Sequence, residues 1–127
     1  MKTIKQEYII DAPVEKVWRA FIDHEEINEW GGGPAKMDDK VGSAFSLWGG
    51  DIHGTNVRVE ENRVLEQDWY GGEWSEPSRV KFILSEVNGK TKVELIQQNV
   101  PDKEIDNIDD GWRRYYLGPM KEYLEKK

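Results

Sequence analysis

The hydrophobic residues of this chain change their spacing several times, and the order of these changes constrains the fold more than any other feature. Apolar and polar positions alternate in residues 3–11, apolar residues recur every three or four positions in residues 13–30, alternation returns in residues 34–100, and the helical spacing returns after Pro101. Alternation is typical of a half-buried strand, and a repeat near 3.6 is typical of an amphipathic helix. The pattern therefore predicts a strand, two short helices, a run of strands and a long final helix.

Two short helices are expected between positions 13 and 30. Pro13 fits the first position of the first helix, where its missing N–H costs nothing. The residues that share one face of this helix are Val14, Val17, Trp18 and Phe21. Asp23 is a candidate N-cap for the second helix, with Glu26 three residues later as in a capping box. We expect the Gly-Gly-Gly-Pro segment of residues 31–34 to end that helix and to form a mobile connection that gates a cavity mouth.

The clearest pair of strands covers residues 78–86 and 91–99. Apolar residues alternate with charged ones in both, and Asn88-Gly89 lies between them. Both turn residues tolerate the positive φ that a type I′ hairpin requires. Three further strands are predicted from residues that we assign to their inward faces: Phe45 and Leu47, Val57 and Val59, and Leu65 and Trp69. The middle of the chain is therefore expected to be an antiparallel meander.

The final helix is predicted from apolar residues spaced by three or four, which are Ile105, Ile108, Trp112, Tyr116, Met120 and Leu124. Asp102 is a possible cap for it. Pro119 lies inside this helix and cannot donate to the carbonyl of Tyr115, so we expect a kink there.

A sheet with one apolar face and a helix with one apolar stripe can both be buried only by packing together, which gives an α+β fold. We expect a helix-grip architecture, in which a curved antiparallel sheet of about six or seven strands surrounds the long C-terminal helix. No linker-like stretch interrupts the chain, so residues 1–127 are expected to form a single domain. A curved sheet can leave an apolar space beneath the helix, and small ligands use such spaces.

Charge and composition exclude several classes of function. The net charge is −7, whereas nucleic-acid binding and anionic membranes both favour a surplus of Lys and Arg. The chain has no cysteine and two histidines, which leaves few candidate ligands for a metal site. No apolar run is long enough for a membrane span or a signal sequence. We therefore expect a cytoplasmic protein without a metal, a cofactor, a nucleic-acid partner or a membrane partner.

The candidate binding site is the space between the sheet and the final helix. The side chains expected to surround a small apolar ligand there are Phe45, Leu47, Trp69, Val80, Phe82, Leu84, Val93, Leu95, Gln97, Trp112, Tyr116 and Met120. Gln97 and Asn99 continue the inward side of their strand and would orient the ligand. An alternative interpretation is that the apolar members of this set simply form the hydrophobic core.

No catalytic residue is predicted. His53, close to Asp51, faces the interior if the alternation of Val57 and Val59 extends back along the strand. It could then act as a base, but a satisfied polar residue near a hairpin is the favoured interpretation, because no nucleophile lies at a fixed spacing.

Two stretches of the chain resemble a known family. IIDAPVEKVWRAFID at positions 9–23 and GWRRYYLGPMKEYLE at positions 111–125, supported by VNGKTKVEL at positions 87–95, are similar to the C-terminal domain of the activator of the 90-kDa heat-shock chaperone ATPase. That domain belongs to the START-like superfamily, often called SRPBCC, which has a Bet-v-type helix-grip fold. The resemblance implies this fold over nearly the whole chain.

Three functions are then open. The first is a non-enzymatic START-like domain that binds a small apolar molecule. The second, implied by the resemblance, is a co-chaperone-like module that binds or stimulates a 90-kDa heat-shock chaperone. The third is a small-molecule enzyme on the same fold, which would use His53 or the hydroxyls of Tyr115 or Tyr116.

Overall fold

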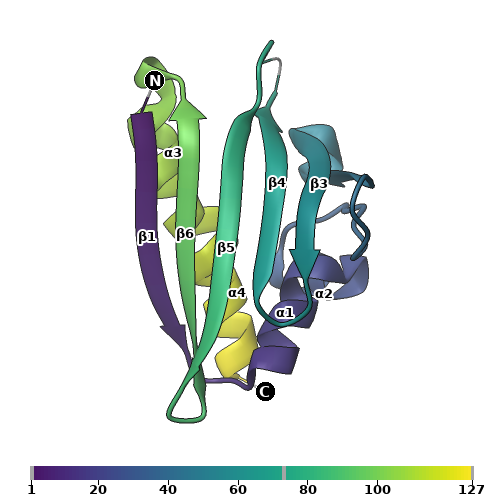
Figure 1. The fold of residues 1–127 in the computed structure, drawn as a ribbon, viewed down its shortest axis with the longest axis vertical. Coiled ribbons are helices and arrows are strands. Elements are labelled where there is room, and N and C mark those ends of the chain that lie inside the picture. Colours follow the sequence, from purple (N-terminus) through teal and green to yellow (C-terminus); the bar gives the residue numbers. More distant parts are fainter. Residues whose placement is uncertain (1, 73, 127) are drawn as a thin grey trace.

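The computed structural model describes residues 2–72 and 74–126 (Figure 1). The strands are β1 (Lys2–Ile10), β2 (Ala44–Leu47), β3 (Ile52–Glu60), β4 (Val64–Gly71), β5 (Ser78–Val87) and β6 (Lys90–Val100). The helices are α1 (Val14–Ile22), α2 (His24–Trp30), α3 (Ile105–Gly111) and α4 (Leu117–Glu125). Short 3₁₀ turns cover Trp48–Gly50 and Asp102–Glu104, and a π-helical segment, Trp112–Tyr116, joins α3 to α4.

The strands form one antiparallel sheet in the order β1-β6-β5-β4-β3-β2. All four labelled helices lie on the same face of this curved sheet, and α4 crosses behind β6 and β5 (Figure 1). One hydrophobic core joins the sheet to the helices. The predicted α+β architecture, with a six-stranded sheet around a C-terminal helix and two short helices after the first strand, is confirmed.

The hairpin between β5 and β6 has the predicted turn. Asn88 and Gly89 both have positive φ, 52° and 80°, and Val87 pairs with Lys90 on either side of them. Because the turn sets the register, the inward residues of the two strands lie opposite each other, for example Phe82 opposite Leu95. Both of these side chains are fully buried.

The two short helices also form where the spacing predicts them, with differences at their first residues. Pro13 is the N-cap of α1 rather than its first helical residue. Asp23 caps α2, its carboxylate accepting a hydrogen bond from the backbone N–H of Glu25 at 2.9 Å. The capping box is wrong at Glu26, because its carboxylate instead accepts a hydrogen bond from the hydroxyl of Tyr123 on α4, at 3.1 Å.

The glycine-rich segment after α2 is hydrogen-bonded to the turn that follows β2, and its expected role as a mobile gate stays a prediction. The carbonyl of Gly32 accepts a hydrogen bond from the backbone N–H of Trp48 at 2.9 Å, and the carbonyl of Pro34 accepts one from Gly49 at 3.0 Å. A Cβ atom at Gly33 would lie 2.1 Å from the side-chain oxygen of Asn28. Hydrogen bonds and close packing therefore hold this segment in place.

The irregularity predicted in the final helix takes the form of the π-helical segment, which ends at Tyr116, three residues before Pro119. A Cβ atom at Gly118 would lie 1.9 Å from the carbonyl oxygen of Arg113, so only glycine allows this close approach of the backbone. The wider turn leaves Trp112 and Tyr116 both buried against the sheet, and α4 continues that face with Met120. Such π-helical turns often occur at functional sites.

A bulge in β3 places the side chains of the first half of this strand on the opposite face of the sheet from the predicted one. Asn56 pairs with Gln67 and Arg58 pairs with Glu66, so Val57 is the extra residue. Val59 packs against the core as predicted, but Asn56 is the buried residue before the bulge, and the prediction for Val57 is wrong. The Gln67 side-chain nitrogen donates to the side-chain oxygen of Asn56 at 2.9 Å, so these two buried polar side chains are hydrogen-bonded to each other. The alternation of apolar and polar residues could not reveal this pair.

Candidate functional site

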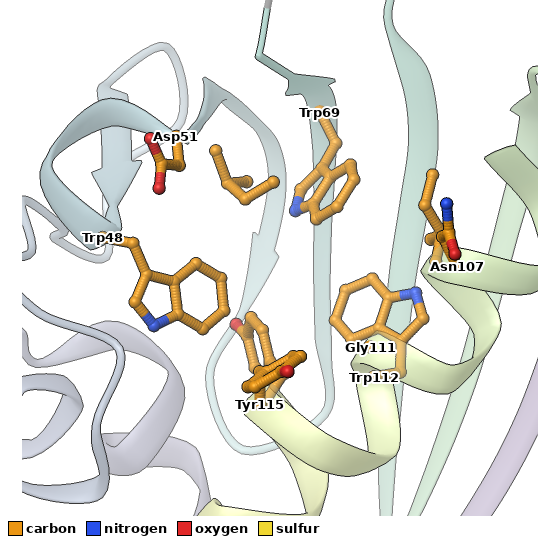
Figure 2. Close-up of a pocket in the computed structure, with 10 residues that line it drawn as sticks. Trp48, Asp51, Trp69, Asn107, Gly111, Trp112 and Tyr115 are labelled. Atoms are coloured by element: carbon orange, nitrogen blue, oxygen red, sulfur yellow. The ribbon is translucent and has the colours of Figure 1, made fainter.

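A cavity of about 380 Å³ lies at one end of the space between the sheet and the C-terminal helical region. The residues that line it come from the turn after β2, the start of β3, the end of β4, α3 and the π-helical segment. They are Trp48, Asp51, Ile52, Trp69, Asn107, Ile108, Gly111, Trp112, Tyr115 and Tyr116. Figure 2 shows Trp48 on one side of the cavity and Trp69 and Trp112 on the other.

Stacked aromatic rings form the walls. The rings of Trp69 and Trp112 are 5.4 Å apart and nearly parallel, with an interplanar angle of 28°. The ring of Tyr116 lies 4.8 Å from Trp112 and 6.2 Å from Trp48, edge-on to the latter. Aromatic pairs at such separations contribute to stability beyond the area that they bury.

Trp48 is held at the cavity in a strained backbone conformation. Its φ is 50°, which is unusual for a bulky residue. Its backbone N–H donates to the carbonyl of Gly32, and its indole N–H donates to the carbonyl of Gly31 at 2.8 Å. With both donors used by the glycine segment, the half-buried ring offers only carbon atoms to the cavity.

A chain of hydrogen bonds fixes the opposite wall. The indole N–H of Trp112 donates to the side-chain oxygen of Gln97 at 2.8 Å, and the Gln97 side-chain nitrogen donates to the Ser78 hydroxyl at 2.8 Å. That hydroxyl donates to the backbone carbonyl of Trp69 at 3.2 Å. Gln97 therefore positions Trp112 and is not itself a lining residue. Asn99, predicted inward with Gln97, has φ of 63° and is exposed, because this conformation turns Val100 inward instead.

Two donors beside the cavity have no acceptor. The indole N–H of Trp69 and the hydroxyl of Tyr116 are both buried and make no hydrogen bond to any residue in the described part of the chain. Burial raises the pKa of the Tyr116 hydroxyl, so it stays protonated and remains a donor at physiological pH.

Three of the twelve predicted site residues line the cavity: Trp69, Trp112 and Tyr116. The other nine are almost fully buried and belong to the hydrophobic core or, for Gln97, to the polar chain beneath it. They are Phe45, Leu47, Val80, Phe82, Leu84, Val93, Leu95, Gln97 and Met120. The core interpretation thus describes most of the space under the helix, and the cavity occupies one end of it.

Sequence reasoning missed most of the cavity wall. Ile108 and Tyr115 could have been found, because with Gly111 they share the helical face of Trp112 at spacings of three and four. Trp48 could not have been found, because its position depends on hydrogen bonds to residues 31 and 32, which no local pattern shows.

Of the three residues considered for an enzyme, Tyr115 and Tyr116 line the cavity and His53 does not. Because of the bulge at Val57, His53 lies on the other face of the sheet, where it pairs with Tyr70 and stacks on its ring at 5.2 Å. A ring nitrogen of His53 lies 3.1 Å from the carbonyl oxygen of Gly72. Tyr115 is 62% exposed, so the expectation of a buried hydroxyl holds for Tyr116 alone.

Residues 2–72 and 74–126, which the structure describes, also bear on metal binding and on membrane insertion. They contain no cluster of three or more His, Cys, Asp or Glu side chains placed to hold a metal ion. Among them, too, there is no helix with the length and apolar character needed to cross a membrane.

Comparison with known proteins gives a consistent set of matches. The family model described as "Activator of Hsp90 ATPase homolog 1-like protein" matches residues 11–125. The activator of 90 kDa heat shock protein ATPase homolog of Dictyostelium discoideum is 27% identical over 94% of this chain and 32% of its own length. The chain spans about a third of the length of the curated relatives that it matches.

Solved structures share the fold. The crystal structure of an HSP90 activator from Plasmodium falciparum has a TM-score of 0.88 and 24% identity, and the match covers 98% of this chain and 96% of that one. The crystal structure of CalU16 from Micromonospora echinospora has a TM-score of 0.80 and 31% identity, covering 96% of this chain and 72% of that one.

Proposed function

The chain belongs to the family of Activator of Hsp90 ATPase homolog 1-like proteins, and we propose that it is a non-enzymatic domain of this family that binds a small apolar molecule in the cavity. The observation that carries the proposal is the cavity itself, about 380 Å³ in volume and walled by Trp48, Trp69, Trp112 and Tyr116. Its volume lies within the range of about 300 to 1,000 Å³ that is usual for ligand pockets. Of the twelve predicted residues, this proposal keeps Trp69, Trp112 and Tyr116 as ligand contacts.

The aromatic walls of the cavity fit a ligand-binding site better than a crevice filled with water. Water gains little from a wall of indole and phenol rings, whereas an apolar ligand that covers them removes that surface from water. Each 100 Å² of apolar surface covered in this way is worth about 2.5 kcal/mol before the costs of association. A ligand with two fused rings would therefore bind measurably.

Gly111 offers a direct test. A Cβ atom at this helical position would meet only one ring carbon of Tyr115, at 4.0 Å, so a side chain can be added there without a backbone clash. We expect Gly111→Phe to occupy the cavity and to abolish binding of Nile red, an uncharged dye whose fluorescence rises in apolar sites. The matched control, Gly111→Ala, leaves most of the cavity free and keeps the dye bound.

Native mass spectrometry of freshly purified protein complements this test by revealing a small molecule that co-purifies. The proposal would be contradicted if Nile red does not bind the wild-type chain and no small molecule co-purifies with it. Equal dye binding by Gly111→Phe would place the dye elsewhere and would also count against it.

A co-chaperone-like function is the second candidate, favoured by the family match and by relatives that are named activators of 90 kDa heat shock protein ATPase. In this proposal the chain binds a 90-kDa heat-shock chaperone or stimulates its ATPase. The assay is the ATPase rate of the purified chaperone with increasing amounts of this protein, together with a direct binding measurement. An unchanged rate and no binding would contradict it. Stimulation by Gly111→Phe equal to that by the wild type would show that chaperone binding does not need the cavity.

Both candidates treat residues 1–127 as one domain that works in the cytoplasm. The net charge of −7 opposes binding to nucleic acid or to an anionic membrane surface. Neither proposal requires a cofactor.

A further inference from the structure

The indole N–H groups of the tryptophans around the core differ in whether they have a hydrogen-bond acceptor. Three of them donate to an acceptor within 2.9 Å: Trp30 to the carbonyl of Ala20, Trp48 to that of Gly31, and Trp112 to the side chain of Gln97. The indole of Trp69, which lines the cavity, has no partner among the described residues, and neither has the hydroxyl of Tyr116, another lining residue. In Figure 2 the Trp69 nitrogen points toward the space between Trp69 and Trp48.

Two unpaired donors among the lining residues indicate that the ligand supplies an acceptor. A buried donor without an acceptor costs free energy, and an incoming acceptor recovers that cost only on binding. Both donor atoms are shielded from water by neighbouring atoms. The group that fits these two donors is an acceptor with no donor of its own, such as a carbonyl oxygen at the edge of a ring.

The charges around the cavity exclude an anionic ligand. The ten lining residues include no Lys, Arg or His, and the single charged one is Asp51, a carboxylate. The nearest arginines in sequence are already paired: Arg113 with Asp109 at 3.0 Å and Arg114 with Asp110 at 2.8 Å. A carboxylate ligand would lose its hydration and find no counter-charge.

The walls favour a flat molecule. Trp69 and Trp112 are nearly parallel to one another, and Trp48 faces them across the cavity (Figure 2). Their faces and edges can stack with another aromatic ring, which adds to the hydrophobic gain. A flexible acyl chain would fill the same volume without this contribution and would lose more conformational entropy.

We propose that the cavity selects an uncharged, flat aromatic molecule that carries a carbonyl oxygen, an inference that rests on the proposed ligand-binding function. The carbonyl oxygen accepts hydrogen bonds from the Trp69 indole and the Tyr116 hydroxyl, while the rings lie between Trp48 and Trp112. Fatty acids and aromatic carboxylates are poor ligands of the same site.

Three probes of the same ring system separate the parts of this proposal. They are 2-acetylnaphthalene, which has the carbonyl, 2-ethylnaphthalene, which lacks it, and 2-naphthoate, which is anionic. Dissociation constants are measured by titrating ¹⁵N-labelled protein and following the indole N–H signals. We expect 2-acetylnaphthalene to bind at least about three- to tenfold more tightly than 2-ethylnaphthalene, because even one of the two hydrogen bonds gives a factor of that size. We expect 2-naphthoate to bind more weakly than both. Hydrophobicity alone predicts the reverse order for the first two.

The variant Tyr116→Phe removes one donor and keeps the ring. We expect it to reduce the preference for 2-acetylnaphthalene over 2-ethylnaphthalene by about threefold or more, with affinity for 2-ethylnaphthalene unchanged. Trp69→Phe tests the other donor in the same way. The matched control is Tyr70→Phe, which changes a tyrosine on the opposite face of the sheet and should leave the preference intact.

The results of these experiments separate this inference from the proposed ligand-binding function on which it rests. If 2-ethylnaphthalene binds as tightly as 2-acetylnaphthalene, or if Tyr116→Phe and Trp69→Phe both keep the preference, the carbonyl assignment is wrong while ligand binding stands. If 2-naphthoate binds as tightly as the ketone, the exclusion of anions is wrong. If none of the three probes binds at the cavity, the inference is overturned, and failure of Nile red as well removes the proposed function.

Discussion

The same substitution, Tyr→Phe, should raise the stability of the fold at one tyrosine, lower it at a second and leave it nearly unchanged at a third. The hydroxyl of Tyr116 is buried with no acceptor in the described part of the chain. The hydroxyl of Tyr8 donates to the side-chain oxygen of Gln6 at 2.6 Å. Tyr115 is 62% exposed and free to hydrogen-bond with water. Each substitution removes one oxygen atom and little else, so the differences report the surroundings of that atom.

The magnitudes follow from these surroundings. An unpaired buried hydroxyl costs about 1 to 3 kcal/mol, and Tyr116→Phe leaves a small gap that offsets part of the gain, so we expect stabilisation of about 1 kcal/mol. In a chain of this length that raises Tm by about 4 °C. Tyr8→Phe loses a half-buried hydrogen bond and should destabilise by about 1 kcal/mol. Tyr115→Phe should stay within about 0.5 kcal/mol of the wild type.

The assay is urea unfolding followed by circular dichroism, with thermal unfolding as a second readout. All three variants should keep the wild-type m-value, because the fold and its buried surface do not change. Destabilisation by Tyr116→Phe of the size seen for Tyr8→Phe would refute the reasoning, since it would mean that the Tyr116 hydroxyl has a hydrogen-bond partner in the folded protein.

Two further predictions concern the C-terminal helix. Gly118→Ala should destabilise the fold by about 2 kcal/mol or more, since its Cβ would lie 1.9 Å from a backbone carbonyl oxygen. Gly111→Ala should instead stabilise it by about 0.5 to 1 kcal/mol. Equal urea midpoints for the two variants would contradict this prediction. Hydrogen bonds from Lys121 and from the backbone N–H of Asp11 hold the pKa of Glu125 below its usual value of 4.5. Its stabilising effect is therefore present above that pH and lost as the pH falls through the lowered pKa. Glu125→Gln should be less stable than wild type at pH 7, by about 1 kcal/mol at most, and equal to it at pH 2; a difference independent of pH would show that the charge has no part in it.

The elements that sequence reasoning identified correctly are those whose signals are local. Asn88-Gly89 specifies its own turn, and the alternation on either side of it specifies which side chains face inward. The spacing of Trp112, Tyr116 and Met120 likewise defines a buried helical face. These features depend on a few neighbouring residues, so one sequence suffices to predict them.

The errors arose where distant parts of the chain decide the outcome. The bulge at Val57 is set by pairing with β4, and it moved His53 to the opposite face from the cavity. Trp48 stands at the cavity because carbonyls 16 and 17 residues earlier hold it there. Whether Phe82 lines a space or fills it depends on how closely the helix approaches the sheet, which periodicity does not report.

The most direct test of the binding claim is the indole N–H region of the ¹⁵N NMR spectrum during titration with 2-acetylnaphthalene. The signals of Trp69 and Trp112, assigned by substitution, should shift in a saturable way. The signal of Trp30, whose N–H donates to the carbonyl of Ala20 in the core, should stay in place. Unchanged signals at Trp69 and Trp112 at saturating probe, or shifts of equal size at Trp30, would contradict binding in the cavity.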